Sequence, residues 1–347
     1  MRFYNRPHQY YCGIDLHVKT MYVCMLDGAG QVVVHRNVPS TPAAFLEIVG
    51  PYRGDLVVSA ECMFTWYWLA DVCAAEAITF VLGHALAMKA IHGGKTKNDR
   101  IDPHKIAVLL RGGLLPQAYV YPAAMRSTRD LLRRRLPLVR KRGQLLAHIQ
   151  NTRAQYNLPA FEKRLAYPGN REGVVEHFPD PSVRKSIDVD VVLIDQYDAL
   201  VNDLERTIVR DAKRHDGDAF HRLRSVPGIG KVLALTILYE IHDITRVDRV
   251  QEFASYARLI TCAKESAGKK LGTGGATMGN VHLQWACSEA AVRFLRHTTD
   301  GKKILARLEK KHGKGKALSI LAHTIGRAVY DMLARGTVFS LEKFLAT

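Results

Sequence analysis

The sequence is poor in cysteine and lacks long hydrophobic runs. Six cysteines occur in 347 residues, and no two of them are spaced as Cys-x-x-Cys. So few thiols without that spacing exclude a disulfide framework and a cysteine-rich zinc site, and we expect free core thiols in a reducing cytoplasm. No apolar run approaches the roughly 20 residues of a membrane span, and the N-terminus has no apolar signal core. The sequence therefore predicts a soluble cytoplasmic protein with no membrane partner.

Acidic side chains are scarce relative to basic ones. The chain has 33 Asp and Glu residues against 50 Lys and Arg residues, a formal net charge of +17. Residues 1–122 hold eleven basic and nine acidic residues, so nearly all of the excess lies in the rest of the chain. Such an excess indicates a polyanionic partner, with nucleic acid ahead of an anionic membrane surface. The 47% of hydrophobic residues excludes a wholly disordered chain.

Residues 1–122 predict an α/β domain. Three β-rich runs, at 11–16, 21–27 and 31–38, are joined by short turns and therefore form an antiparallel meander. The further elements expected are a helix at 42–49, a strand at 55–61, a helix at 64–75, a strand at 78–82 and a helix at 102–112. This order of elements is that of the ribonuclease H-like fold, and it makes the first and fourth strands neighbours.

Residues 123–215 predict a basic, helical coiled-coil segment. Leucines repeat every seven residues along a helix that extends to Asn151, and Pro137 predicts a kink or break within it. An irregular stretch at 152–190 precedes a second heptad run from Ile194 to Ile208. The two helices would pair antiparallel, either within the chain or across a dimer. Residues 216–347 are expected to be mostly α-helical, with glycine-rich loops at 226–230 and 268–280.

Four acidic residues occupy positions typical of metal ligands. Asp15 ends the first strand, Glu61 ends the fourth, and Asp99 and Asp102 lie at the start of the last helix of this domain. Neighbouring strands would place Asp15 and Glu61 side by side, and converging carboxylates are costly unless a cation neutralises them. Mg²⁺ prefers such oxygen ligands, and two ions about 4 Å apart would stabilise the attacking and leaving oxygens of a phosphodiester.

Each acid also has an ordinary explanation. An aspartate at a strand end is commonly a turn residue, and Asp102, directly before Pro103, could cap a helix. Pro103 also biases Asp102 away from helical angles, which weakens the expected pairing of Asp99 with Asp102 on one helix face. The joint order of the four acids on strand, strand and helix start favours a metal site.

Basic side chains dominate the start of the middle segment. Nine stand against a single acid there: Arg126, Arg129, Arg133, Arg134, Arg135, Arg140, Lys141, Arg142 and Arg153. A solvated helix face normally mixes signs, so we interpret the excess as phosphate contacts, which give affinity without sequence information. A second basic stretch comprises Lys302, Lys303, Lys310, Lys311, Lys314 and Lys316.

A glycine-rich turn precedes an apolar helical run in the last third of the chain. Gly228, Gly230 and Lys231 belong to the stretch Pro-Gly-Ile-Gly-Lys. Glycines let the backbone approach a phosphate, and the following helix start presents free N–H groups. The stretch is therefore typical of a helix-hairpin-helix motif, but it is equally typical of a simple packing corner between helices.

Ser266 lies in a lysine-rich stretch. Lys264, Lys269 and Lys270 flank it and would hold a phosphate beside the serine hydroxyl. A serine is a weak nucleophile unless it is activated, and carboxylate-bound metal ions would polarise the phosphate. On the residues alone, a serine in such a loop is usually a linker.

These motifs together resemble the DEDD insertion-sequence transposases, recombinases guided by a bridge RNA. The matching stretches are GIDLH at Asp15, SAE at Glu61, KNDRIDPHKIA, LRSVPGIGKVLA and ESAGKKLGTGGATMGNVHLQW. The similarity spans essentially the whole chain. The N-terminal and C-terminal motifs are specific for this family when they occur together, whereas the middle of the chain is only generically similar. It implies a RuvC-like DEDD domain at 1–122, a coiled-coil segment at 123–215 and a transposase domain at 216–347.

The resemblance also implies a chemistry and a set of partners. The metal-binding tetrad would be Asp15, Glu61, Asp99 and Asp102. Ser266 would be the nucleophile that forms a covalent phosphoserine with DNA, although the family more often has Ser-Gly or Ser-Ser-Gly where this chain has Ser-Ala-Gly. The implied partners are target and donor DNA, a structured guide RNA whose base pairing chooses the sequence, and further copies of the chain that share the active site.

Two other functions compete with this interpretation. A metal-dependent, structure-specific nuclease that uses water needs the four acids and the basic segments but not Ser266. A non-catalytic nucleic-acid-binding protein needs only the basic segments. Asp15→Ala separates the binding protein from both enzymes, and Ser266→Ala separates the recombinase from the nuclease.

Overall fold

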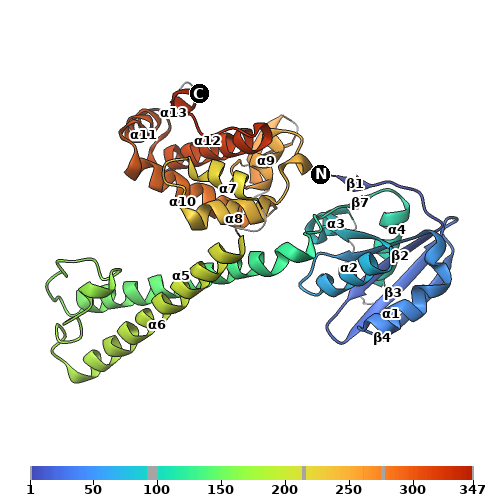
Figure 1. Cartoon of the computed structure of the whole chain (residues 1–347), viewed down its shortest axis with the longest axis horizontal. Helices are drawn as coiled ribbons and strands as arrows, with labels where there is room; N and C mark the ends of the chain where they lie inside the picture. The colour runs from blue at the N-terminus through green and yellow to red at the C-terminus, as the bar shows by residue number, and fades with distance from the viewer. Residues whose placement is uncertain are drawn as a thin grey trace. The chain divides into compact units, whose positions relative to one another are not determined.

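The chain forms two compact units, Met1–Ala124 and Met125–Thr347. The structure is a computed structural model that describes residues 2–91, 101–212, 216–260, 262–266, 268–274 and 278–345. Figure 1 shows a sheet flanked by helices in the N-terminal unit and helices almost throughout the C-terminal unit. Among the described residues, no helix is both long enough and apolar enough to span a membrane.

A five-stranded sheet in the order β4-β3-β2-β5-β6 organises the N-terminal unit. Its strands are β2 (Tyr10–Leu16), β3 (Thr20–Asp27), β4 (Val32–Pro39), β5 (Leu56–Glu61) and β6 (Thr79–Gly83). Strands β2, β3 and β4 form the predicted antiparallel meander, while β5 pairs parallel with β2, and β6 pairs parallel with β5. The structure thus confirms that the first and fourth predicted strands are neighbours.

Helices cover both faces of this sheet. They are α1 (Pro42–Val49), α2 (Trp66–Ala75), α3 (Ala85–Ile91) and α4 (Ile101–Arg111). Phe45 of α1 and Leu69 of α2 belong to a core cluster with Ile14 and Val58 of the sheet, whereas Ile106 of α4 packs with Val57 on the opposite face. Because both faces are covered, β2 and β5 are apolar along most of their length.

Local sequence patterns predicted most of these strands and helices, and the elements that they missed are short. Thr41 caps α1 by accepting a hydrogen bond from the amide of Ala44 at 3.3 Å, and Pro42 opens the helix, as the sequence predicts. The sequence did not predict α3 or the two-stranded pair β1 (Phe3–Tyr4) and β7 (Leu115–Pro116). Strands of two residues carry no periodic pattern, so only their tertiary pairing reveals them.

Gly13 lets α4 pack directly on β2. A Cβ atom at Gly13 would lie 2.2 Å from the carbonyl oxygen of Pro103 and 2.5 Å from the amide nitrogen of Ala107. Both atoms belong to the backbone of α4, so the helix itself would have to move to accept a side chain. The contact holds the first two turns of α4 against the middle of β2.

Gly13→Ala is therefore expected to lower the free energy of unfolding by about 1–3 kcal/mol, the usual cost of overpacking. Chemical denaturation of the purified protein measures this change. Gly54→Ala is a matched control, because a Cβ atom there has no heavy atom within 4 Å. Equal stability of the two variants would contradict the close packing of α4 on β2.

Two long antiparallel helices begin the C-terminal part of the chain. They are α5 (Ala123–Gln155) and α6 (Pro181–Ala212), and a connection containing the short 3-10 helix Pro168–Asn170 joins them. Two ion pairs and one hydrogen bond define their register. Arg142 pairs with Asp198 at 2.5 Å and Arg135 with Glu205 at 2.6 Å, and His148 is hydrogen-bonded to Asp190 at 2.5 Å. Residue numbers fall along α5 as they rise along α6, so the predicted heptad helices pair within the chain.

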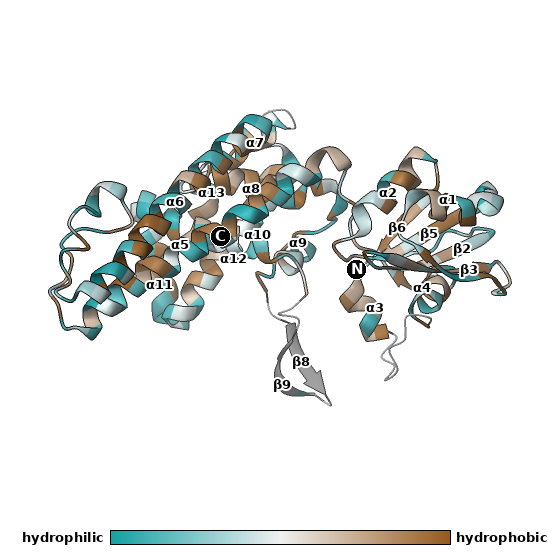
Figure 2. Ribbon diagram, turned by 90° about the horizontal axis from the view of Figure 1, so that it is seen from below, coloured by the Kyte–Doolittle hydropathy of each residue, from teal (hydrophilic) through white to brown (hydrophobic). Residues whose placement is uncertain are grey.

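Helix α5 is continuous through Pro137, so, of the kink or break that the sequence predicted there, the break is absent. Proline in a helix interior removes one backbone hydrogen bond and costs about 3 kcal/mol. The neighbouring side chains Leu136 and Leu138 are both buried, and their burial offsets that cost. Figure 2 shows hydrophobic and hydrophilic residues intermixed along α5 and α6, as expected for amphipathic helices.

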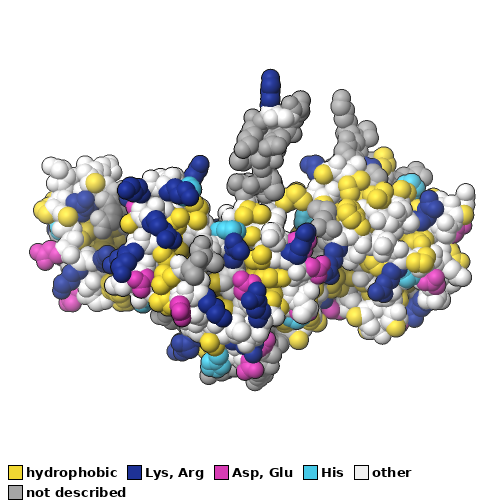
Figure 3. All heavy atoms as spheres, turned by 90° about the horizontal axis from the view of Figure 1, so that it is seen from above, with side chains coloured by type: hydrophobic (Ala, Val, Ile, Leu, Met, Phe, Trp, Pro, Cys, Tyr) yellow, Lys and Arg dark blue, Asp and Glu magenta, His cyan; other side chains and the backbone are white. Residues whose placement is uncertain are grey.

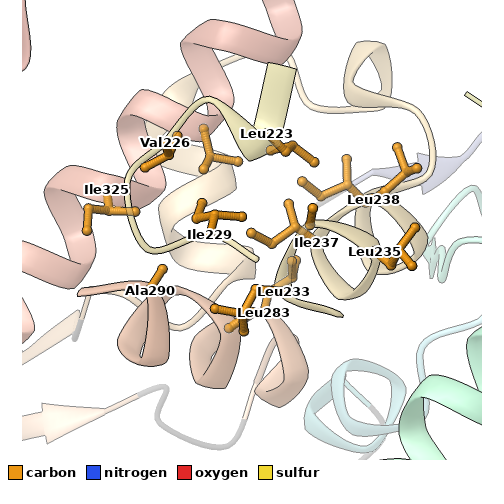
Figure 4. Packing of buried hydrophobic residues seen from close by; sticks show 14 of the residues in the cluster. Leu223, Val226, Ile229, Leu233, Leu235, Ile237, Leu238, Leu283, Ala290 and Ile325 are labelled. Atoms are coloured by element: carbon orange, nitrogen blue, oxygen red, sulfur yellow. The ribbon is translucent and has the colours of Figure 1, made fainter. Parts of the chain in front are cut away.

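The remaining helices build one hydrophobic core. They are α7 (Gly217–Arg224), α8 (Lys231–Ile241), α9 (Val250–Tyr256), α10 (Val281–His297), α11 (Thr299–His312), α12 (Lys314–Arg335) and α13 (Leu341–Leu345). Figure 4 shows Ile229, Leu233 and Leu283 close together at the centre of this core, where α8 and α10 meet. Every residue of α8 from Leu233 to Ile241 is buried.

Within the described part of the chain, a hairpin interrupts these helices, and its second strand lies where the sequence predicted a glycine-rich loop at 268–280. It consists of β8 (Cys262–Ser266) and β9 (Lys269–Gly274), which pair antiparallel. Glycine and lysine have low strand propensity, so composition alone argued against strands there. The cross-strand backbone hydrogen bonds of the hairpin outweigh that propensity.

Candidate active site and nucleic-acid interface

Asp15 and Glu61 lie at the carboxyl ends of two adjacent parallel strands. The last registered pair of β2 and β5 is Ile14 with Ala60, so the two acids come one position later in each strand. Side chains alternate between the faces of a sheet, so both acids share the face of Gly13, the face that α4 covers. The structure thus brings these two predicted residues side by side.

Asp102 lies on α4, the helix that covers the sheet face shared by Asp15 and Glu61. It lies in the first turn of α4, one residue before Pro103, whose carbonyl approaches Gly13. The expectation that Pro103 would push Asp102 out of helical geometry is wrong, because a proline is tolerated in the first turn, where its missing N–H has no partner to lose. Asp99, the fourth predicted acid, lies outside the described residues.

Asp15 and Asp102 are partly exposed, and each has a basic side chain within 4 Å. The side chain of Asp15 is 22% exposed and lies 3.2 Å from Nε2 of His17. The side chain of Asp102 is 27% exposed and lies 3.4 Å from Nζ of Lys105. No three His, Cys, Asp or Glu side chains within the described ranges are close enough together to hold a metal ion. The described donor set at this edge is therefore two adjacent acids and a third on the neighbouring helix.

Ser266 is the last residue of β8, at the turn of the hairpin. It pairs with Lys269 across a turn that contains Gly268, and Glu265 pairs with Lys270 one step further from the turn. Gly268 has φ +74°, a conformation that residues with a side chain rarely adopt. The backbone register therefore places the predicted nucleophile at the turn end of the hairpin with two of the predicted phosphate-binding lysines, Lys269 and Lys270, whereas Lys264 lies further from the turn.

A network of hydrogen bonds surrounds a buried carboxylate near Asn280, the residue that precedes α10. Glu240 of α8 accepts hydrogen bonds from Arg129 at 2.8 Å, Arg133 at 2.7 Å and Asn280 at 2.8 Å. Asn280 also accepts hydrogen bonds from the amides of His282 and Leu283, and so caps α10. The network joins α5, α8 and α10 around one negative charge.

Glu240 is only 1% exposed, so its charge has to be compensated within the protein. Burial raises the pKa of its carboxyl, but the hydrogen bond from Arg133 and the charges of Arg129 and Arg133 outweigh burial and hold the pKa at about 2. Sequence reasoning did not single out Glu240. The available signal was a lone acid at the end of an apolar helical run, KVLALTILYEI.

The structure divides the basic residues of α5 into two groups. Four of the arginines assigned to phosphate contacts have carboxylate partners within the chain: Arg129 and Arg133 with Glu240, Arg135 with Glu205, and Arg142 with Asp198. Arg126 is buried, and Arg153 donates to the carbonyl of Leu158 at 2.8 Å. The exposed members are Arg134, Arg140 and Lys141. The count of nine basic residues against one acid considered only residues close together in the sequence. In the folded chain, α6 and α8 provide carboxylates for four of these arginines.

The glycine-rich turn before α8 combines packing with an exposed helix start. Gly228 has φ +91°, and a Cβ atom there would lie 2.6 Å from the amide nitrogen of Phe294 in α10. Gly228 therefore serves close packing between helices. Gly230 and Lys231 are exposed at the N-terminus of α8, where no side chain caps the first amides. This end of the turn keeps the features of a phosphate-binding site.

The second basic stretch lies on α11 and the start of α12. Lys310 and Lys311 are exposed in the last turn of α11, whereas Lys303 pairs with Asp300 at 3.0 Å. Figure 3 shows Lys and Arg side chains spread over one face of the molecule, with Asp and Glu side chains among them. Exposed bases of this kind suit the backbone of a nucleic acid better than a single small anion.

Comparison with known proteins indicates the class of protein to which this chain belongs. Residues 12–157 match the family model of the DEDD transposase domain of IS110 elements. Residues 220–306 match the family model of the transposase IS116/IS110/IS902 family. The chain is 22% identical over 335 residues to the transposase for insertion sequence element IS1111A of Coxiella burnetii, covering 93% of this chain and 89% of that protein. It is 24% identical over 255 residues to the putative transposase y4qE of Sinorhizobium fredii, covering 70% and 60%.

The two matched regions contain the carboxylate edge and the serine hairpin respectively. They define the chain as a transposase, an enzyme that cuts and rejoins DNA in recombination. More particularly, the chain belongs to the IS110 family of insertion-sequence transposases.

Proposed function

We propose that this transposase uses a serine nucleophile and a divalent cation, and that a structured RNA directs it to its DNA sites. The observation that carries the proposal is the side-by-side placement of Asp15 and Glu61 at the carboxyl edge of β2 and β5. Such an edge, with a third acid on the helix that covers it, is suited to phosphoryl transfer. The strand order of the N-terminal unit supports a RuvC-like, ribonuclease H-like domain.

The residues at this edge fit a hard cation. Carboxylate oxygens are the donors that Mg²⁺ prefers, and partial exposure leaves room for its waters and a phosphate. Asp15 and Glu61 would hold the ion as neighbours in the sheet, and Asp102 and Asp99 would complete its ligand set, because the described acids alone are not close enough together to hold it. When bound, Mg²⁺ would neutralise the charge that develops on the reacting phosphate. By holding the cation, the carboxylates would set the position of that phosphate relative to the sheet edge.

Ser266 would carry the covalent step. Its hydroxyl oxygen attacks the phosphorus atom, a serine–phosphate bond forms, and the bond from phosphorus to the leaving sugar oxygen breaks. The serine proton passes to solvent, and the leaving oxygen takes up a proton. Joining reverses this step: a sugar hydroxyl of the new partner strand attacks the phosphoserine and releases the serine. Lys269 and Lys270, beside Ser266 in the hairpin, would hold the phosphate oxygens.

The two halves of the proposed site belong to different units of the chain. Asp15 and Glu61 lie in the first unit and Ser266 in the second, so catalysis requires them to converge on one phosphate. We propose that this happens in an oligomer in which the site is shared between subunits. The exposed bases of α5 and α11 would hold DNA and RNA backbones, and the coiled-coil segment at 123–215 would separate the DEDD and transposase domains.

A trapping assay tests the proposal. The purified protein is mixed with Mg²⁺, end-labelled DNA that carries the element's own junction, and RNA transcribed from the flanking non-coding region. We expect a slow, protease-sensitive DNA band on a denaturing gel, because the phosphoserine links the protein to the strand. Ser266→Ala should remove that band, whereas Ser288→Ala on α10 should retain it.

The assay also separates the competing functions. Clean cleavage without a covalent band, equal in wild type and Ser266→Ala, would show a nuclease that uses water and would refute the serine assignment. Binding without any cleavage in the wild-type protein would refute both enzymes. Equal band intensity with and without the RNA would refute RNA guidance alone.

A further inference from the structure

The two most exposed large hydrophobic side chains in the described part of the chain flank the candidate carboxylates. Phe64 is 79% exposed and Val18 is 69% exposed. Phe64 follows Glu61 by three residues, and Val18 follows Asp15 by three residues. Single exposed apolar residues are ordinary, but two at the same sheet edge, one beyond each acid, call for a functional explanation.

The loop that carries Phe64 is tied to the strands on both sides of it. The amide of Cys62 donates to the carbonyl of Gly83 at 2.9 Å, and the amide of Met63 donates to that of Glu61 at 2.8 Å. The hydroxyl of Thr65 donates to the carbonyl of Leu16, at the end of β2, at 3.1 Å. Trp66, which begins α2, is buried directly afterwards. The loop therefore holds Phe64 outward at a fixed position relative to both acids.

We infer that Phe64 stacks on a DNA base next to the phosphate that is cut, and that Val18 contacts the nucleotide on the other side. This inference rests on the proposed function, because it places the reacting phosphate at Asp15 and Glu61. A phosphate in a strand has one nucleotide on each side, which matches the two apolar side chains beyond the two acids. An aromatic ring stacks on any base, and apolar side chains inserted at a base step unstack it.

The consequence is a local opening of the duplex at the step that is cut. A phosphodiester in stacked B-form DNA is restrained by the base pairs on both sides of it, and unstacking one base frees the backbone to bend toward a nucleophile. Phe64 has no hydrogen-bonding group, so it would read no sequence. Its contribution should therefore be largest where the step is well paired and small where pairing is already lost.

Single-turnover cleavage of two DNA substrates tests this role. Both carry the element's junction and are supplied with the same RNA and Mg²⁺, but one has a mismatched base pair next to the cut. Phe64→Ala should slow cleavage of the paired substrate by about ten- to a hundred-fold, the usual effect of losing one base–aromatic stack. Its defect should largely disappear on the mismatched substrate, and Phe64→Trp should restore most of the rate on the paired one.

A control variant and a reference variant make the outcome decisive. Tyr167→Ala removes another exposed aromatic side chain, in the connection between α5 and α6, and should cut both substrates at the wild-type rate. Wild-type cleavage of the paired substrate by Phe64→Ala, or an equal loss on both substrates, would overturn the stacking role. Asp15→Asn should cut both substrates about a hundred- to a thousand-fold more slowly than the wild type; if it cuts both at the wild-type rate, the proposed function fails, whatever Phe64→Ala does.

Discussion

Replacing Asp15 by asparagine, or Glu61 by glutamine, is expected to slow DNA cleavage by about a hundred- to a thousand-fold. Each change keeps the size of the side chain and removes one negative charge from the sheet edge. The lost carboxylate can no longer help to hold a cation against the reacting phosphate. Single-turnover cleavage of junction DNA measures the loss, and its size should decrease as the Mg²⁺ concentration is raised.

Binding of the same DNA should behave differently from cleavage. The two variants remove negative charge, so they should bind DNA at least as tightly as the wild-type protein in a gel-shift titration. Glu47→Gln is the matched control, because Glu47 is an exposed acid on α1, which covers the opposite face of the sheet. Wild-type cleavage rates in the Asp15 and Glu61 variants would show that the acids are structural.

Glu240→Gln is expected to lower the free energy of unfolding of the C-terminal unit by about 3–5 kcal/mol. The substitution keeps the shape of the side chain but leaves Arg129 and Arg133 without their carboxylate. Arg129 is almost fully buried, so water cannot replace the lost partner. Urea denaturation followed by far-UV circular dichroism measures the change. Glu252→Gln removes the exposed pair with Arg249 and should cost less than about 1 kcal/mol; an equally small loss for Glu240→Gln would contradict the buried network.

The same carboxylate predicts a pH dependence. The pKa of Glu240 is held at about 2 in the folded state, against an ordinary value of 4.5. As the pH falls, the unfolded state therefore takes up this proton before the folded state does. The stabilisation is complete above about pH 4.5 and is lost as the pH falls toward 2. The difference in stability between wild type and Glu240→Gln should therefore shrink below about pH 4.5.

The sequence alone determined the features that depend on local pattern. Alternating and continuous apolar runs placed the five strands of the main sheet, and Thr41 with Pro42 placed the start of α1. The order of these elements made β2 and β5 neighbours and so brought Asp15 and Glu61 together. The heptad spacing likewise predicted α5 and the part of α6 from Ile194 to Ile208, whereas the first turns of α6, from Pro181, lie in a stretch that the sequence predicted to be irregular. Each of these inferences needs only neighbours in sequence and the small set of allowed connections.

Only the tertiary structure decided which charges are available to a partner. Arg129, Arg133 and Arg135 are basic by sequence, yet α8 and α6 provide their carboxylates from more than 60 residues away. Composition counts a charge wherever it occurs, whereas its availability depends on which side chains the folded chain brings within a few ångströms. For the same reason, the exposure of Phe64 beside Glu61 became visible only when the loop's hydrogen bonds to two strands were known.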